Sequence, residues 1–305
     1  MASHSAPVFG GQALVEGVLI RTGERWAVAL RRPDGEIHRS EGTIGTAAGP
    51  WRLPFLRGLR ALGVQFRLGM RALIDSSVMA EHGELRPLPM LGLAMMIGVS
   101  LVIGLFVFTA LPLLLTGRDP AAEATIAQRL SEGLVKTAFL AVYVVGVTRV
   151  ARYRRIFSYH GAEHMAIACA EAGEDLTVEN VGRHNPAHPR CGTGFLVILA
   201  SVDTFVLAVL PRMGELTDLA LRIGFLPITA AVAYELLRWG SRQRGIGFAL
   251  NRFGLFTQRL TTARPDRDQI EVAIAALELC RAPRSIGAEA ASLALAPVPQ
   301  VASQP

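Results

Sequence analysis

Four long apolar segments dominate the pattern of hydrophobic and polar positions along the chain. They cover residues 89–117, 133–149, 192–212 and 219–239. The first is uncharged and exceeds the roughly 20 residues that a helix needs to cross about 30 Å of hydrocarbon. A short turn joins the last two segments, which favours a helical hairpin. The pattern predicts four transmembrane helices.

A polar, β-prone region precedes these segments and predicts a small β-rich module over residues 8–53. Three short runs with high β propensity carry this prediction, at 13–21, 25–33 and 35–43. Pro33, Asp34 and Gly35 signal a turn between the last two runs.

An amphipathic helix is predicted over residues 54–82. Its apolar residues recur every three or four positions, at Leu59, Leu62, Phe66, Met70 and Leu73, whereas arginines favour another side. A helix with a basic face and an apolar face can lie in the membrane interface, and we expect that placement because the next segment enters the bilayer. The alternative is a helix that packs against its own domain.

Soluble segments are predicted after the second and fourth apolar segments. Residues 150–191 form a histidine-rich loop with a short helix that ends near Ala172 and Gly173. In the C-terminal region, 245–282, Asp266 and Gln269 have the spacing of a capping box and predict a helix over about 267–280. Residues 283–305 are rich in Ala, Ser and Pro and predict a disordered tail.

The composition agrees with a membrane protein. Hydrophobic residues make up 51% of the 305 residues, the mean hydropathy is +0.36, and charged residues make up 18%, against about 25% in typical soluble domains. The N-terminus has no basic segment followed by an apolar core, so no cleaved signal peptide is expected. The three cysteines are an odd number without a C-x-x-C pair, which argues against a disulfide framework.

The basic residues indicate the orientation of the predicted helices. They are concentrated before the first apolar segment, between the second and third, and after the fourth. Positive charge favours the cytoplasmic side, so both termini and residues 150–191 are predicted to be cytoplasmic. The net charge of +6 is not gathered in one continuous patch, so nucleic acid is not an expected partner. The expected partners are the lipid bilayer and other membrane proteins.

The candidate chemistry lies in residues 150–191. His160, Glu163 and His164 form the pattern H-x-x-E-H, which on a helix places both imidazoles on one face. Two imidazoles at that spacing can bind one zinc ion, and a neighbouring carboxylate can act as a general base on water bound to the metal. The same order of residues occurs in the inverzincin metallopeptidases. The alternative is a surface helix whose histidines pair with Glu163.

Further ligands follow in the same loop. His188 and Cys191 form H-x-x-C, and four of the seven histidines of the chain lie between residues 160 and 188. His160, His164, His188 and Cys191 would make a closed four-ligand metal site, which is typical of a structural role. His160 and His164 with a carboxylate, such as Glu171 or Glu179, would leave a position open for catalysis.

Two other interpretations of this loop stay open. Cys191 could act as a nucleophile with a histidine base, and Arg190 could bind an anion. Cys169 is expected to be a buried small hydrophobic residue.

Charged residues also occur within the apolar segments. Asp203 lies about halfway along the third segment, where a carboxylate is costly and often functional; Arg222, Thr229 or Tyr234 is its expected partner. Glu235 is expected to pair with Arg238 at the boundary of the fourth segment. Lys136 can extend its amine from the end of the second segment to the membrane surface.

The chain resembles the YqhQ-like bacterial membrane proteins, a family of unknown function described as predicted metal-dependent enzymes. The resemblance is carried by these stretches: GGQALVEGVLIR at 10–21, LRGLRAL at 56–62, FSYHGAEHMAIACAEAGEDLTVENV at 157–181, HPRCGTGFL at 188–196, LPITAAVAYELLR at 226–238 and LTTARPDRDQIEVAIAAL at 260–277. It implies a multi-pass protein of the bacterial cytoplasmic (inner) membrane with the histidine-rich loop at its centre, and no established substrate.

The sequence therefore predicts a mainly α, polytopic helical membrane protein with about four transmembrane helices. It adds a small N-terminal β-rich module, an amphipathic interfacial helix and a C-terminal soluble helix. The predicted function is a metal-dependent enzyme, a zinc hydrolase at the cytoplasmic face, with Glu163 as the general base. The alternatives are a non-enzymatic assembly or scaffold factor with a structural metal or none, and a transporter with Asp203 in the path.

Overall fold

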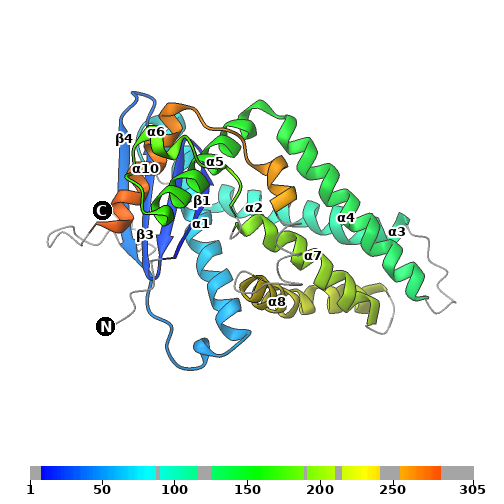
Figure 1. Cartoon of the computed structure of the whole chain (residues 1–305). Coiled ribbons are helices and arrows are strands. Elements are labelled where there is room, and N and C mark those ends of the chain that lie inside the picture. The colour runs from blue at the N-terminus through cyan, green and yellow to red at the C-terminus, as the bar shows by residue number, and fades with distance from the viewer. Residues whose placement is uncertain are drawn as a thin grey trace, which may run out of the picture.

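The structure is a computed structural model that describes residues 8–86, 90–115, 125–188, 191–209, 215–240 and 255–282. A small β-sheet with helices on both of its faces forms one end of the molecule, and a group of long helices forms the other (Figure 1). The protein is mainly helical with an N-terminal antiparallel sheet, as the sequence predicted.

The sheet is a four-stranded antiparallel meander in the order β1-β2-β3-β4. Its strands are β1 (Phe9–Leu14), β2 (Gly17–Thr22), β3 (Arg25–Arg31) and β4 (Ile37–Thr43). The turn predicted at residues 33–35 is confirmed, with Gly35 at φ 90° and Arg32 N–H donating to the Glu36 carbonyl at 2.8 Å.

The first β-prone run, 13–21, is not one strand. It is divided by a tight turn at Val15 and Glu16, and Glu16 has a φ of 53°. The turn is held by the end of the neighbouring strand β3, because Arg31 N–H donates to the Glu16 carbonyl at 2.7 Å. This turn was not predicted, because no glycine or proline marks positions 15 and 16.

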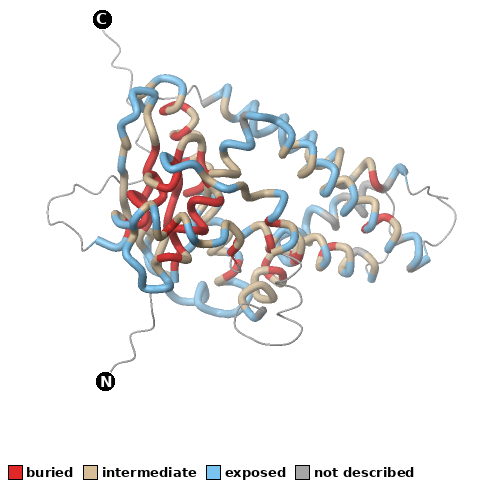
Figure 2. Tube along the Cα trace, turned by 45° about the horizontal axis from the view of Figure 1, so that its top comes forward, coloured by how far each residue is buried: buried red, intermediate tan, exposed pale blue. Residues whose placement is uncertain are grey.

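Alternate residues of the strands contact helices on opposite faces of the sheet, as the two-residue period of a strand requires. Val18, Ile20, Ala27 and Ala29 pack against α5 (Ala151–Ala172) and α10 (Arg267–Arg281). Leu19, Trp26, Val28 and Leu30 pack against α1 (Leu56–His82). Each fully buried large apolar side chain contributes about 1.5–3 kcal/mol, so the sheet binds all three helices. Figure 2 shows that buried residues are concentrated at this end.

Helix α1 extends over nearly all of the predicted amphipathic segment but buries a different stripe. Leu68, Ala72 and Met79 pack against the sheet, whereas Leu59 and Phe66, from the predicted apolar stripe, are exposed. The C-terminal half of α1 is thus a helix that packs against its own domain. The N-terminal half of α1 exposes apolar side chains that do not pack against the sheet.

The apolar segments are helical over their described residues. They form α2 (Met90–Leu105), a π-helical turn (Phe106–Ala110), α3 (Leu111–Leu115), α4 (Ile126–Arg149), α7 (Gly192–Val209) and α8 (Glu215–Gly240).

Two of the described helical stretches, Leu91–Phe108 and Leu130–Arg149, are long and apolar enough to cross a membrane by length and composition. Gly192–Val206 is a shorter apolar helix. A core helix of a soluble protein can pass the same test, so this finding is weak support for a membrane protein. The prediction of four spans is not confirmed.

Helix α4 begins seven residues before the predicted segment at 133. Thr125 and Gln128 form a capping box, with Gln128 N–H donating to Thr125 Oγ1 at 3.3 Å and Thr125 N–H donating to Gln128 Oε1 at 2.9 Å. These bonds satisfy backbone donors that a helix end leaves free. Thr125 and Gln128 are visible in the sequence as a capping box, but the predicted segment was placed from its apolar residues, which begin later in the chain.

Residues 150–191 contain more helix than predicted. Helix α5 occupies 22 residues and is part of the core, and the short helix α6 (Val178–Val181) follows it. The predicted end is confirmed by Gly173, which has a φ of 75°. The predicted start of α10 is also confirmed, since Asp266 N–H donates to Gln269 Oε1 at 3.0 Å. The predicted disordered tail, 283–305, lies outside the described residues.

Charged residues of the apolar helices pair differently from the sequence-based expectation. Lys136 of α4 forms a salt bridge with Asp203 of α7, and Asp203 is 4% exposed. Glu235 of α8 accepts two hydrogen bonds from Arg57 of α1, at 2.8 and 2.5 Å. Arg238, the expected partner of Glu235, also attracts its carboxylate. Lys136 and Arg57 were not predicted as partners, because pairing between helices depends on their packing, which spacing along one helix does not reveal.

Removal of one member of the Lys136–Asp203 pair leaves the other charge buried between α4 and α7. We expect Lys136→Met to lower the free energy of unfolding by about 3 kcal/mol. Adding Asp203→Leu should restore most of the loss, because the buried charge is then also removed. Thermal unfolding in detergent measures both variants, with Ser201→Ala on the exposed side of α7 as the control. A double variant as unstable as the single one contradicts the prediction.

Candidate metal centre

Helix α5 presents two histidines on the side that faces away from its core contacts. Tyr159, Ala162 and Ala166 of the same helix are buried in the sheet-side core. His160 and His164 are one turn apart, as the four-residue spacing requires, and their ring centroids are 4.4 Å apart. The H-x-x-E-H pattern therefore places both imidazoles side by side, as predicted.

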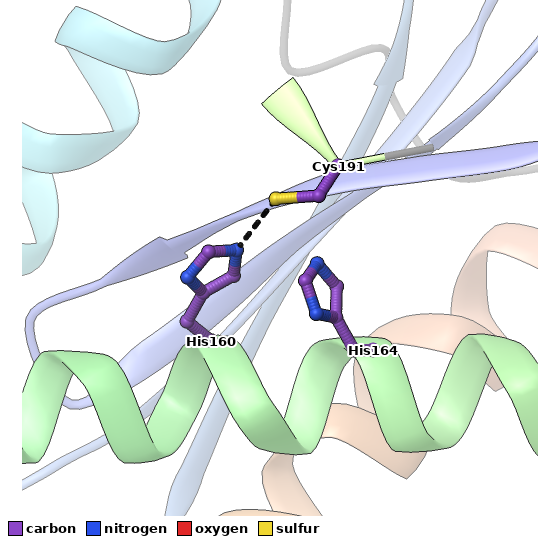
Figure 3. A group of neighbouring side chains, drawn as sticks. All are labelled: His160, His164 and Cys191. Atoms are coloured by element: carbon purple, nitrogen blue, oxygen red, sulfur yellow. Dashed lines mark hydrogen bonds between the residues drawn. The ribbon is translucent and has the colours of Figure 1, made fainter. Parts of the chain in front are cut away.

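Cys191 completes a group of three metal-binding side chains. It is the residue before α7, and its Sγ lies 3.2 Å from His160 Nε2. One ligand atom from each of His160, His164 and Cys191 lies within 4.8 Å of the others. In Figure 3 both rings point from α5 toward Cys191.

Backbone carbonyls fix the orientation of both imidazole rings. The Thr261 carbonyl lies 2.8 Å from His160 Nδ1, and the Pro186 carbonyl lies 2.6 Å from His164 Nδ1. Because a carbonyl only accepts hydrogen bonds, each Nδ1 carries the proton and each Nε2 keeps its lone pair. Metal-binding histidines usually have such a partner on the second nitrogen.

A glycine within the motif allows this arrangement. A Cβ added at Gly161 would lie 2.1 Å from the Ala263 carbonyl oxygen. Ala263 N–H donates to the Phe157 carbonyl at 3.0 Å, so residues 261–263 lie directly against α5. Only a residue without a side chain permits the approach that brings the Thr261 carbonyl to His160.

The Cys191 thiol lies at the N-terminus of α7. Thr193 N–H donates to Sγ at 3.4 Å, and the Thr193 hydroxyl lies 3.2 Å from Sγ. Burial raises the pKa of the Cys191 thiol, while these two bonds lower it. A helix N-terminus also stabilises negative charge, which favours the thiolate that metals bind.

His188 lies beside this group but is directed elsewhere. Its ring centroid is 5.7 Å from that of His164, and its Nε2 lies 3.4 Å from Glu171 Oε2. Its backbone exchanges two hydrogen bonds with the Gln258 side chain, at 2.8 and 2.9 Å. The structure thus brings together three of the four predicted ligands and places the fourth next to them.

The alternative carboxylate ligands are occupied by other partners. Glu171 faces His188, and Glu179 forms a salt bridge with Arg267 at 3.3 Å. Arg190, the candidate anion-binding residue, lies outside the described residues. The proposed nucleophile–base pair of Cys191 and His160 has a suitable distance, so the contact permits thiol chemistry as well as metal binding.

Glu163 is buried between α5 and the sheet. It is 3% exposed, and a Cβ added at Gly11 of β1 would lie 2.7 Å from Glu163 Oε1. Burial raises the pKa of Glu163 to about 8, and the nearby His160 acts in the opposite direction. Glu163 is therefore a buried carboxyl group near the candidate ligands, and burial favours its protonated form.

His164 and His188 remain neutral in this environment. Burial, followed by the nearby His160, lowers the pKa of His164 to about 3. Burial also lowers the pKa of His188. Neutral imidazole is the form that binds metal ions, so the fold holds His164 ready for binding at physiological pH.

Comparisons with known proteins agree with the resemblance seen in the motifs. A family model described as "Protein of unknown function (DUF1385)" matches residues 53–282. The chain belongs to this family. It is also 32% identical over 299 residues to the uncharacterized protein YqhQ of Bacillus subtilis (strain 168), with 90% of this chain and 92% of that protein covered. No solved structure matches the chain. The matched family region includes every candidate ligand, and the β-strands precede it.

Gly11 is expected to be essential for the packing of Glu163. Gly11→Ala places a methyl group against Glu163 and within 2.5 Å of the Leu19 carbonyl oxygen, which should lower the free energy of unfolding by about 2 kcal/mol. Gly10→Ala is the matched control, because nothing lies within 4 Å of its added Cβ. Thermal unfolding compares the two variants. Equal stability of Gly11→Ala and Gly10→Ala would show that Glu163 does not pack against β1.

Proposed function

We propose that this protein is a multi-pass membrane protein with a zinc-type metal centre at its cytoplasmic face, and that the centre is hydrolytic. The observation that carries the proposal is the convergence of His160, His164 and Cys191, with each histidine held by a backbone carbonyl at Nδ1. The enzyme class and the metal go beyond the family assignment, which implies neither.

The donor set fits zinc. Nitrogen and sulfur ligands bind zinc at about 2.0–2.3 Å, so two such atoms in a tetrahedral shell lie about 3.5 Å apart. The 3.2 Å contact between His160 Nε2 and Cys191 Sγ is close to that separation. His164 contributes the remaining nitrogen from one helical turn away.

Three protein ligands favour catalysis over a purely structural role. Structural zinc sites are usually closed by four protein ligands, whereas catalytic sites keep one position for water or substrate. A metal bound here would supply Lewis acidity and lower the pKa of coordinated water. Glu163, adjacent in sequence to His164, would accept and return the proton in its carboxylate form, which the nearby His160 and a bound cation would favour against the effect of burial.

The helical end of the molecule supports the membrane part of the proposal. Its helices expose large apolar side chains, among them Leu91, Val102, Leu134, Val142 and Phe205. Apolar surface of this extent marks an interaction site or a membrane-facing surface. We retain the four predicted spans. Both termini and residues 150–191 are placed in the cytoplasm, because the basic residues are concentrated beside these segments and positive charge favours the cytoplasmic side.

The exposed N-terminal half of α1 also supports a membrane-facing surface. Phe55, Leu56, Leu59 and Phe66 are exposed at the end of α1 that does not pack against the sheet. Arg57 joins this end to α8 through Glu235. The bilayer interface is the surface that would cover these side chains.

A non-enzymatic membrane factor with a structural metal is the second candidate. The proximity of His188 favours it, because its ring centroid is 5.7 Å from that of His164. A rotation of His188 away from Glu171 would supply a fourth ligand. The number of protein ligands in the metal-loaded protein therefore separates the two candidates.

Loss of either histidine or of Cys191 is expected to remove the metal bound at this centre. His160→Ala, His164→Ala and Cys191→Ala should each lower zinc affinity by more than about tenfold, since each removes one direct ligand. Elemental analysis of protein purified in detergent measures the metal content. Glu163→Gln is the matched control on the same helix, and it should keep the metal while abolishing hydrolysis. Wild-type protein without bound transition metal in repeated preparations contradicts the proposal.

The membrane topology can be tested independently of the chemistry. Alkaline phosphatase is active only outside the cytoplasm, so fusions at residues 120 and 213 should be active. Fusions at residues 86, 185 and 282 should be inactive, because the proposal places these positions in the cytoplasm. Activity at 185 would place the histidine-rich region on the other side of the membrane and would contradict the proposed topology.

A further inference from the structure

The C-terminus of α5 folds back on itself through a glycine turn. Gly173 has a φ of 75°, and its N–H donates to the Ala170 carbonyl at 3.2 Å. Glu174 N–H donates to the Cys169 carbonyl, also at 3.2 Å. This pair of bonds is a Schellman motif. Its consequence is that Glu174 lies beside Cys169 although it follows the end of the helix.

The chain then runs through α6 and returns to the C-terminal end of α5. Thr177 caps this helix, with its Oγ1 accepting from Asn180 N–H at 3.1 Å, and Val181 is buried in the core. His184 N–H donates to the Val181 carbonyl at 3.1 Å. The return brings His184 Nε2 to 3.4 Å from Glu174 Oε2.

Three different metal-binding side chains therefore meet at the end of α5. One ligand atom from each of Cys169, Glu174 and His184 lies within 4.8 Å of the others. We propose that these residues form a second metal site, which takes a zinc-type divalent cation in a structural role. A thiolate, an imidazole and a carboxylate are the three ligand types that zinc uses. The site does not depend on the hydrolytic function proposed above.

A surface ion pair is the competing explanation, and it accounts for only part of the arrangement. It explains the contact of His184 with Glu174, whose side chains are 20% and 45% exposed. Core packing and a hydrogen bond from the Cys169 thiol to the Asp175 carbonyl at 3.6 Å account for the burial of this cysteine. Neither contact requires its sulfur to lie within 4.8 Å of ligand atoms of both Glu174 and His184. Glu174 is the most exposed member of the group, and Cys169 is fully buried.

The second site would stabilise the segment that leads to the candidate hydrolytic centre. His184 is two residues before Pro186, whose carbonyl holds His164 Nδ1 at 2.6 Å. His188 and Cys191 follow in the same segment. A metal that connects His184 to Cys169 would join this segment to α5 at a point independent of His160 and His164. It would thus support the orientation of His164 without taking part in the reaction.

Cobalt binding distinguishes the second site from the first. A cobalt–thiolate bond gives a strong near-ultraviolet charge-transfer absorption, and the chain has three cysteines. In metal-free Cys191→Ala protein, only Cys169 and Cys280 can produce it. We expect about one equivalent of Co²⁺ to produce this absorption in the full-length Cys191→Ala protein in detergent, since one thiolate ligand remains.

Two further variants assign the absorption to a residue. Cys169→Ala, added to Cys191→Ala, should abolish it, whereas Cys280→Ala in the same background should leave it unchanged. His184→Ala changes a loop residue and should weaken cobalt binding by roughly tenfold or more, because a ligand is lost. This variant keeps the test valid if loss of the buried Cys169 side chain prevents folding.

The proposal is overturned if Cys191→Ala protein shows no cobalt–thiolate absorption. It is also overturned if the absorption survives Cys169→Ala or if His184→Ala binds cobalt as tightly as its parent. A different result is expected if His160, His164 and Cys191 do not bind metal. In that case Cys191→Ala protein would bind as much cobalt as the wild type.

Discussion

The packing of α5 against the β-sheet is the constraint on which the rest of the structure depends. Tyr159, Ala162 and Ala166 are fully buried on that side of the helix. The Tyr159 hydroxyl donates to Glu16 Oε2 at 3.1 Å, which joins α5 to the turn between β1 and β2. With this face fixed, His160 and His164 are presented to the segments that return over the helix. A helix free to rotate about its axis would not keep these imidazoles in place.

The two ends of the molecule are connected through the same region. Helix α5 follows α4 after Val150, and α7 begins directly after Cys191. The candidate ligands thus lie where the apolar helices meet the sheet domain. Lys136 and Asp203 hold α4 to α7, and Arg57 and Glu235 hold α1 to α8. Under the proposed function, these contacts would keep the metal centre at the membrane surface.

Features that depend on neighbours in sequence were predictable. The four-residue spacing of the histidines, the helix end at Gly173 and the capping box at Asp266 are all local signals, and the structure contains each of them. The carbonyl partners of the histidines were not predictable, because Thr261 is 101 residues from His160. The same reason applies to Asp203 and Lys136, which are 67 residues apart. These contacts follow from packing between elements, which no periodicity encodes.

X-ray absorption spectroscopy at the zinc edge tests the central claim most directly, because it counts the ligands in the metal-loaded protein. In Cys169→Ala protein, which lacks the thiolate of the second site, the account predicts two imidazole nitrogens, one sulfur and one further light atom that is not a histidine, and loss of the sulfur when Cys191→Ala is added. Three imidazoles and one sulfur would contradict it, since His188 would then close the shell. Absence of sulfur in the wild type would also contradict it.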